Sequence, residues 1–130
     1  LRDCEIFDNF VHMEWIKIST ANELVRVATE EVLYVLADGN YSDLVLISGA
    51  KHKMTFQIHY FEELFEKLDD NPFIRVTRSL IINVRHVHVI NVNDRLLKFG
   101  GKNINPAVPT LRLGRDSLKR LKDKMTDYGD

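Results

Sequence analysis

The sequence predicts a mainly β domain of short strands with one mid-chain helix and one C-terminal helix. Between residues 15 and 58, segments rich in β-branched and aromatic residues alternate with turn residues at close spacing. Only two windows combine helical spacing of apolar residues with stop signals. The chain has 130 residues, of which 45% are hydrophobic and 28% charged, so it can form one domain with a substantial core.

Strands are expected wherever β-rich segments are bounded by turn residues. The expected strands are Trp15–Ser19, Leu24–Ala28, Leu33–Ala37, Tyr41–Ile47, Lys53–Ile58, Phe73–Thr77, His86–Val92 and Arg95–Phe99. Asn93-Asp94 is a hairpin turn candidate between the last two. Residues 103–113 are expected to be an edge or irregular strand, because Pro106 and Pro109 cannot donate to a sheet.

The two helices are expected at about Tyr60–Leu68 and Gly114–Met125. In the first, apolar residues follow the i, i+3, i+4, i+7 spacing from Phe61 to Leu68. In the second, a narrow apolar stripe faces inward and lysines and arginines cover the outer side. Residues 1–14 are interpreted as a connector, and residues 15–130 as the domain.

Charge is unevenly distributed along the chain, although the net charge is only −1. Residues 1–65 contain 5 basic and 11 acidic residues, whereas residues 66–130 contain 13 basic and 8 acidic ones. From Arg75 to Lys124 there are 12 basic residues against 3 acidic ones, a net charge of +9. This stretch favours a surface that faces phosphates, although ordinary solvated faces would give the same count.

Several protein classes fit the sequence poorly. No apolar stretch approaches the ~20 residues of a membrane helix, and no signal peptide opens the chain, so we expect a soluble, cytoplasmic protein. Cys4 is the only cysteine, so an internal disulfide cannot form. The chain begins with Leu1 rather than Met, which leaves open that it is a fragment of a longer protein with a regulatory part.

No catalytic, cofactor or metal site is evident in the sequence. His86 and His88 fall on one face of an expected strand, but no third ligand has suitable spacing, so an ordinary polar pair is favoured. Gly100-Gly101-Lys102 lacks the rest of a phosphate-binding loop and is interpreted as a turn. We expect no enzyme activity, no cofactor and no metal.

The most informative segment is Phe73-Ile74-Arg75-Val76-Thr77-Arg78-Ser79-Leu80-Ile81-Ile82-Asn83. Its polar triplet Thr77-Arg78-Ser79 separates a strand from an apolar run. An arginine on such a connection can reach guanine O6 and N7, or a phosphate, through its planar guanidinium. This segment resembles the signature of the LytTR family of bacterial DNA-binding domains, and Val32–Tyr41 resembles the strand, glycine turn and Asn-Tyr of the same family.

The resemblance covers about Trp15 to Met125 and implies an elongated antiparallel β domain whose loops enter neighbouring major grooves. By position it implies contacts to bases or backbone from Ser42, Arg78 and Arg115. The neighbouring Asn40 and Thr77 are further candidate DNA-binding residues, and Lys119 on the outer face of the last helix is a candidate phosphate contact. The chain departs from the family pattern at Thr77, where His is frequent, at Leu80, where an aromatic is common, and at Gln57-Ile58-His59, where an Arg is expected.

Some of these side chains also have structural interpretations. Arg75 could pair with Asp69, Asp70 or Glu66, and Arg115 could cap a helix or form an ion pair. Asn83 is expected to satisfy backbone groups at a turn rather than to read a base. Tyr41 is expected to pack rather than to stack on a base.

The function expected from these observations is sequence-specific binding of double-stranded DNA, as the output domain of a bacterial transcriptional regulator. An N-terminal regulatory domain and a second copy on DNA are further expected partners. The alternative is a β-rich protein-interaction module that uses a strand edge or the apolar N-terminal segment. Binding of RNA or single strands is disfavoured, because residues 75–98 contain no aromatic residue.

Overall fold

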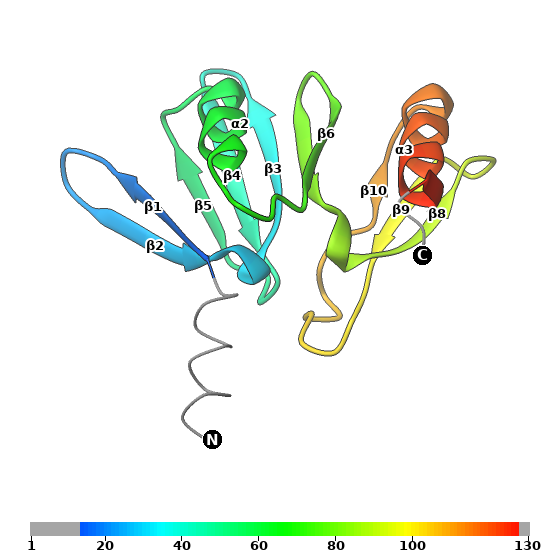
Figure 1. The fold of residues 1–130 in the computed structure, drawn as a ribbon, viewed down its shortest axis with the longest axis horizontal. Helices are drawn as coiled ribbons and strands as arrows, with labels where there is room; N and C mark the ends of the chain where they lie inside the picture. The colour runs from blue at the N-terminus through cyan, green and yellow to red at the C-terminus, as the bar shows by residue number, and fades with distance from the viewer. Residues whose placement is uncertain (1–13, 128–130) are drawn as a thin grey trace.

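A five-stranded antiparallel sheet forms the centre of the protein in the computed structural model, which describes residues 14–127 (Figure 1). Its strand order is β5-β4-β3-β7-β6. These strands are β3 (Val32–Asp38), β4 (Tyr41–Leu46), β5 (Lys51–Met54), β6 (Phe73–Thr77) and β7 (Leu80–Asn83). The predicted connector falls outside the described residues, apart from Glu14.

Two smaller sheets and two helices complete the described fold. The sheets are the hairpin of β1 (Trp15–Ser19) and β2 (Leu24–Ala28), and the sheet of β8 (Val87–Asn91), β9 (Leu96–Phe99) and β10 (Leu111–Arg112). The helices are α2 (Ile58–Glu66) and α3 (Arg115–Asp127), and short 3-10 turns cover Thr29–Glu31 and Val84–His86. The mainly β prediction is confirmed, including its two helices.

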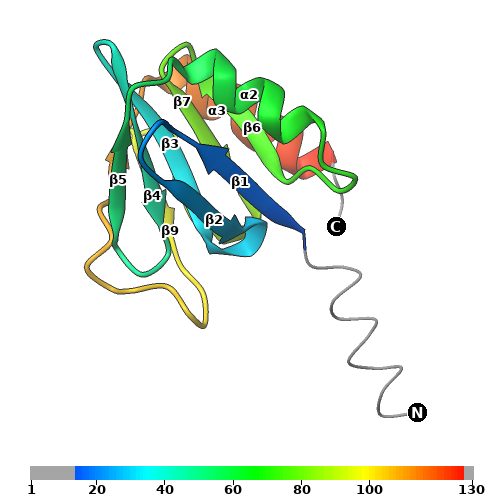
Figure 2. The same cartoon turned by 90° about the vertical axis from the view of Figure 1, so that its left-hand side faces the viewer.

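The central sheet is covered on both faces, which gives the domain two hydrophobic cores. On one face, Ile81 packs with α2 and with the β1–β2 hairpin. On the other face, Leu80 and Ile82 pack with α3 and with β8–β10. Alternate residues of one strand therefore enter different cores, as expected for extended backbone. Figure 1 shows α2 and α3 on the two sides of β6 and the elongated outline that results, and in Figure 2, turned by 90°, α3 lies behind α2.

The bounds of β1, β2 and β6 agree with the sequence prediction, whereas the predicted strand Lys53–Ile58 overlaps β5 only at Lys53 and Met54. Pairing with β4 ends at Met54, and Ile58 begins α2 instead. Ile58 is buried one helical turn before Phe61 and contributes to the same apolar stripe. Within residues 103–113 only Leu111–Arg112 pairs with another strand.

Asn83 holds the end of β7 in place, as expected of a residue that satisfies backbone groups. Its side chain is fully buried. Its Nδ2 donates to the carbonyl oxygens of Thr29 at 3.2 Å and Val32 at 3.0 Å, and its Oδ1 accepts from the backbone N–H of Arg85 at 3.0 Å. One side chain thus joins the β2–β3 and β7–β8 connections.

Candidate nucleic-acid interface

Four connections lie along one edge of the molecule, which we call the loop edge (upper side and upper right of Figure 1). They are the turn Gly39–Asn40 between β3 and β4, the turn Arg78–Ser79 between β6 and β7, the turn Val92–Arg95 between β8 and β9, and residues 113–114 before α3. One hydrogen bond holds the β6–β7 turn against β3, and another joins the β8–β9 turn to the residues before α3. Ala37 N–H donates to the Ser79 carbonyl at 2.8 Å, and Leu113 N–H donates to the Arg95 carbonyl at 3.1 Å.

The loop edge brings together four of the six candidate residues predicted from sequence. Asn40 and Arg78 are exposed within turns, and Arg115 is exposed as the first residue of α3. Thr77 is half-buried at the end of β6, and its Oγ1 accepts from Ser79 N–H at 3.1 Å. Lys119 is exposed about one helical turn further along α3.

Ser42 lies beneath this edge rather than on it. Its side chain is 0% exposed, and its hydroxyl donates to the carbonyl oxygen of Phe56 at 2.8 Å. The hydroxyl therefore connects β4 to the chain entering α2, and we leave Ser42 out of the candidate contact surface. Tyr41 is 45% exposed, and its ring packs against Lys53, whose Nζ lies 5.6 Å from the ring centroid.

Two further arginines lie at the loop edge and were not among the candidates from sequence. Arg95 is exposed in the β8–β9 turn with a positive φ of 60°. Arg112 is exposed at the end of β10, where its Nη1 donates to the Asp94 carbonyl at 3.3 Å. The predicted Asn93-Asp94 turn is the sequence feature that could have placed Arg95 on a connection. Arg112 reaches the edge through the β9–β10 pairing, which the sequence did not reveal.

Arg75 pairs with a different acidic residue from those expected. Its Nη1 lies 2.8 Å from Oε1 of Glu62 on α2, rather than near Asp69, Asp70 or Glu66. Asp70 instead pairs with Arg85.

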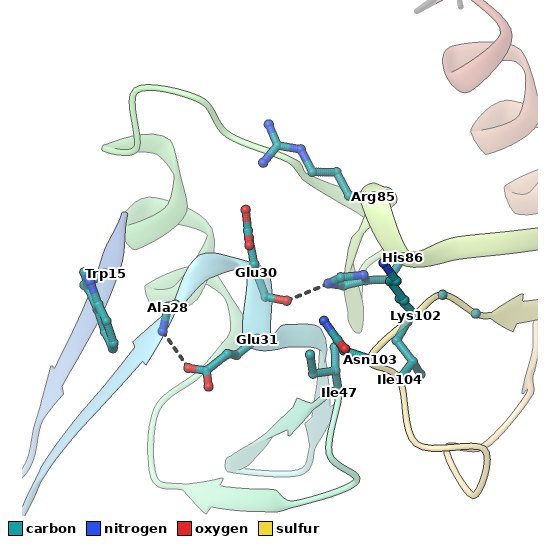
Figure 3. Close-up of a pocket in the computed structure, with 12 residues that line it drawn as sticks. Trp15, Ala28, Glu30, Glu31, Ile47, Arg85, His86, Lys102, Asn103 and Ile104 are labelled. Carbon is teal, nitrogen blue, oxygen red and sulfur yellow. Dashed lines mark hydrogen bonds between the residues drawn. The ribbon is translucent and has the colours of Figure 1, made fainter. Parts of the chain in front are cut away.

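The basic stretch from Arg75 to Lys124 does not gather on one surface. Arg85 and Lys102 lie at the opposite end of the molecule from the loop edge, beside a cavity of about 560 Å³ (Figure 3). The polar groups there hold the backbone: His86 Nε2 lies 2.7 Å from the Glu30 carbonyl, and Glu31 Oε1 accepts from Ala28 N–H at 2.9 Å. The loop edge retains four exposed arginines, Arg78, Arg95, Arg112 and Arg115.

The β3–β4 end of the loop edge is more acidic than the rest. Lys53 Nζ lies 2.8 Å from Asp38 Oδ2 and 3.1 Å from Asp43 Oδ1, so one cation faces two carboxylates. The hydrogen bond from Lys53 lowers the pKa of Asp38 below its usual value and raises the pKa of Lys53. Three of the exposed arginines of the edge, Arg95, Arg112 and Arg115, lie toward β8–β10 and α3.

Residues 14–127 contain no group of three or more potential ligands placed to hold a metal ion. None of the helices in the same residues is long and apolar enough to cross a bilayer.

Comparisons with known proteins agree with this fold. A family model described as the LytTr DNA-binding domain matches residues 22–126. An uncharacterised response regulatory protein of Vibrio cholerae serotype O1 is 32% identical over 88 residues, which are 68% of this chain and 32% of that protein. The chain thus spans about a third of the length of this relative.

A solved LytTr DNA-binding domain from Bacillus cereus has a similar fold. Its TM-score is 0.62 with 18% sequence identity, over 85% of this chain and 95% of the other. At this identity the likeness concerns the fold alone.

Proposed function

Since this chain belongs to the LytTr DNA-binding domain family, we propose that its loop edge reads double-stranded DNA in a sequence-specific manner. The observation that carries this proposal is the set of four exposed arginines on connections anchored by strands and by α3. Phosphate contacts from such residues give affinity, and contacts to base edges give sequence preference.

Arg78 is the residue best suited to read a base. It occupies a two-residue turn that is held against β3 by the hydrogen bond from Ala37 N–H to the Ser79 carbonyl, and its guanidinium can make two parallel hydrogen bonds to guanine O6 and N7. Arg115 begins α3 at another connection of the same edge, where it would contact the duplex at a separate position. Asn40 is assigned a contact near the β3–β4 turn, and Thr77 and Lys119 are assigned supporting contacts.

In the proposed whole protein, this domain is the output module of a bacterial transcriptional regulator. Support comes from the Vibrio cholerae relative, a response regulatory protein about three times as long as the matched segment. We assign the remaining length to an N-terminal regulatory domain, and we assign the protein to the cytoplasm, where DNA is found. We further propose that two copies of the protein bind DNA together, and that binding involves no enzymatic step and no cofactor.

The test is selection from a pool of random duplexes, followed by a salt titration on the enriched site. If about five phosphates are neutralised, the log–log slope of affinity against salt should be near −4 to −5. A single-stranded version of the enriched site is the matched control, and it should bind more weakly. Failure to enrich any duplex, or an affinity that does not change with salt, would contradict the proposal.

A further inference from the structure

The guanidinium of Arg75 braces the turn that carries Arg78. Arg75 lies on β6, and its side chain is 31% exposed. Its Nη2 donates to the carbonyl oxygen of Arg78 at 2.6 Å, and its Nε donates to the carbonyl oxygen of Thr77 at 3.3 Å. Its Nη1 donates to Glu62 Oε1 at 2.8 Å. One planar group therefore bonds two consecutive carbonyls of the connection and a carboxylate on α2.

The β6–β7 turn lacks the backbone geometry that usually fixes a two-residue hairpin. Such hairpins prefer type I′ or II′ turns, which require positive φ at one or both central residues. Among the described residues the only non-glycine with positive φ is Arg95, so neither Arg78 nor Ser79 meets that requirement. The strand register also shifts between Arg75 and Thr77 just before the turn. The direction of this turn therefore depends on bonds from outside its own backbone.

We propose that Arg75, held by Glu62, is a positioning residue that sets the direction in which Arg78 leaves the sheet. The inference rests on the proposed function of the loop edge, because a fixed Arg78 matters only if that residue reads DNA. Arg75 itself stays half-buried and engaged with Glu62 and the turn, so it contributes sequence preference through Arg78 rather than through a phosphate contact. Lysine cannot replace it, since a single ammonium does not reproduce the flat array of donors that meets three fixed acceptors.

The first experiment measures preference for the selected duplex over a scrambled duplex in Arg75→Gln and Arg75→Lys. Both variants should lose preference by about tenfold, with the salt slope unchanged because no phosphate contact is removed. In an Arg78→Ala background the same substitutions should have little further effect, since the side chain that they position is absent. Glu62→Gln should give a smaller loss in the same direction.

The matched control is Arg85→Gln. Arg85 also pairs with a carboxylate, that of Asp70, but it lies at the opposite end of β7 from the turn. The Arg85→Gln substitution should leave both the preference for the selected duplex and the salt slope unchanged. All binding is measured well below the melting temperature of every variant, so that a loss of preference reports a displaced Arg78 side chain rather than an unfolded protein.

A second readout uses the free protein. Because Ala37 N–H donates to the Ser79 carbonyl, its hydrogen exchange reports on the turn. Arg75→Gln should speed exchange at Ala37 and Ser79 more than at strand amides far from the turn, whereas Arg85→Gln should not.

The outcomes distinguish the two proposals. If Arg78→Ala lowers preference but Arg75→Gln leaves preference and exchange at wild-type values, the positioning role is overturned while DNA reading stands. An additive loss in the double variant would likewise overturn it, since the two arginines would then act separately. If wild-type protein prefers no duplex, both proposals fail together.

Discussion

The two ends of β7 carry similar residues but use them differently. At the Asn83 end, polar side chains are engaged with backbone groups, as in the three hydrogen bonds of Asn83 and the contact of His86 with Glu30. At the loop edge, none of the side-chain hydrogen bonds and ion pairs found within residues 14–127 involves the guanidinium of Arg78, Arg95 or Arg115. Side chains bonded internally stabilise the fold, whereas exposed and uncommitted cations remain able to bind an anion.

This difference also explains why charge counted along the sequence is a coarse guide. Arg78 and Arg85 are seven residues apart in the same basic stretch, yet β7 separates them onto opposite ends of the sheet. Only Arg78 reaches the loop edge. Substitutions at the two ends should therefore affect different properties, stability at one and DNA binding at the other.

The largest effect is expected for Asn83→Ala, at the structural end. The change removes three hydrogen bonds and leaves the Thr29 and Val32 carbonyls short of a buried donor. The free energy of unfolding should fall by about 2–3 kcal/mol, measured by urea denaturation. At a temperature where the variant is folded, its preference among duplexes should match the wild type. A stability change below about 0.5 kcal/mol would remove Asn83 from its structural role.

Next in size is Arg78→Ala, at the loop edge. It should weaken binding to the selected duplex by about 1–3 kcal/mol and relax preference at one base position. Its melting temperature should stay within a few degrees of wild type, because the side chain is exposed. Arg85→Ala is the control and should change neither affinity nor preference. Full affinity and preference in a folded Arg78→Ala protein would exclude Arg78 from the interface.

A smaller contrast comes from Lys119→Ala. Lys119 is exposed on α3 beyond the first turn of the helix, so any contact it makes should be to the phosphate backbone. Its loss should weaken selected and scrambled duplexes alike and reduce the salt slope by about 1. A loss confined to the selected duplex would instead make Lys119 a base-reading residue.

Ser42→Ala tests whether the Ser42 hydroxyl stabilises the fold or contacts DNA. The buried hydroxyl bonds the Phe56 carbonyl, so its removal should cost about 1 kcal/mol of stability and leave duplex preference unchanged. Circular dichroism melts and binding to selected and scrambled duplexes measure the two properties. A selective loss of binding to the chosen duplex, without a change in stability, would return Ser42 to the contact surface.

Local patterns were enough to predict much of the fold. Strands β1, β2 and β6 and the two helices followed from residue spacing and turn residues, and Asn83 followed from its place after an apolar run. Strand β7 was missed as a strand. Both of its faces are buried, so it shows a continuous apolar run, Leu80 to Ile82, without the alternation that marks a half-exposed strand.

The parts of the site that could not be predicted depend on contacts between distant segments. The acceptor for Ser42 lies 14 residues away and that for Arg75 on α2 lies 13 residues away, so neither bond has a local sequence signal. Arg112 reaches the loop edge because β10 pairs with β9, across a loop in which proline obscures the strand pattern. Sequence therefore identified Arg78 and Arg115, but not the bonds by which Arg75 holds the Arg78 turn, nor Arg95 and Arg112 on the same edge.

The smallest effect is expected at the acidic end of the loop edge, in Asp38→Asn. Because the folded-state pKa of Asp38 lies below its usual value of 3.8, its carboxylate contributes stability above that value, and the contribution is lost as pH falls through the lower folded pKa. Unfolding measured at pH 7 should show the variant slightly less stable than wild type, and the difference should vanish in stronger acid. A difference that grows in acid would contradict the assigned pairing with Lys53.

The same substitution should change DNA binding in the opposite direction to stability. Asp38 lies beside the Gly39–Asn40 turn, so removing its negative charge should reduce its repulsion of the duplex phosphates. The affinity for duplex DNA should therefore rise modestly at low salt and less at high salt, where the repulsion is screened. Asp70→Asn is the matched control, since Asp70 is exposed and paired with Arg85 at the other end of the molecule. Because Asp70 lies far from the proposed duplex, the affinity of the Asp70→Asn variant for duplex DNA should stay at the wild-type value. Equal gains in the two variants would mean that net charge, rather than the position of the loop edge, governs binding.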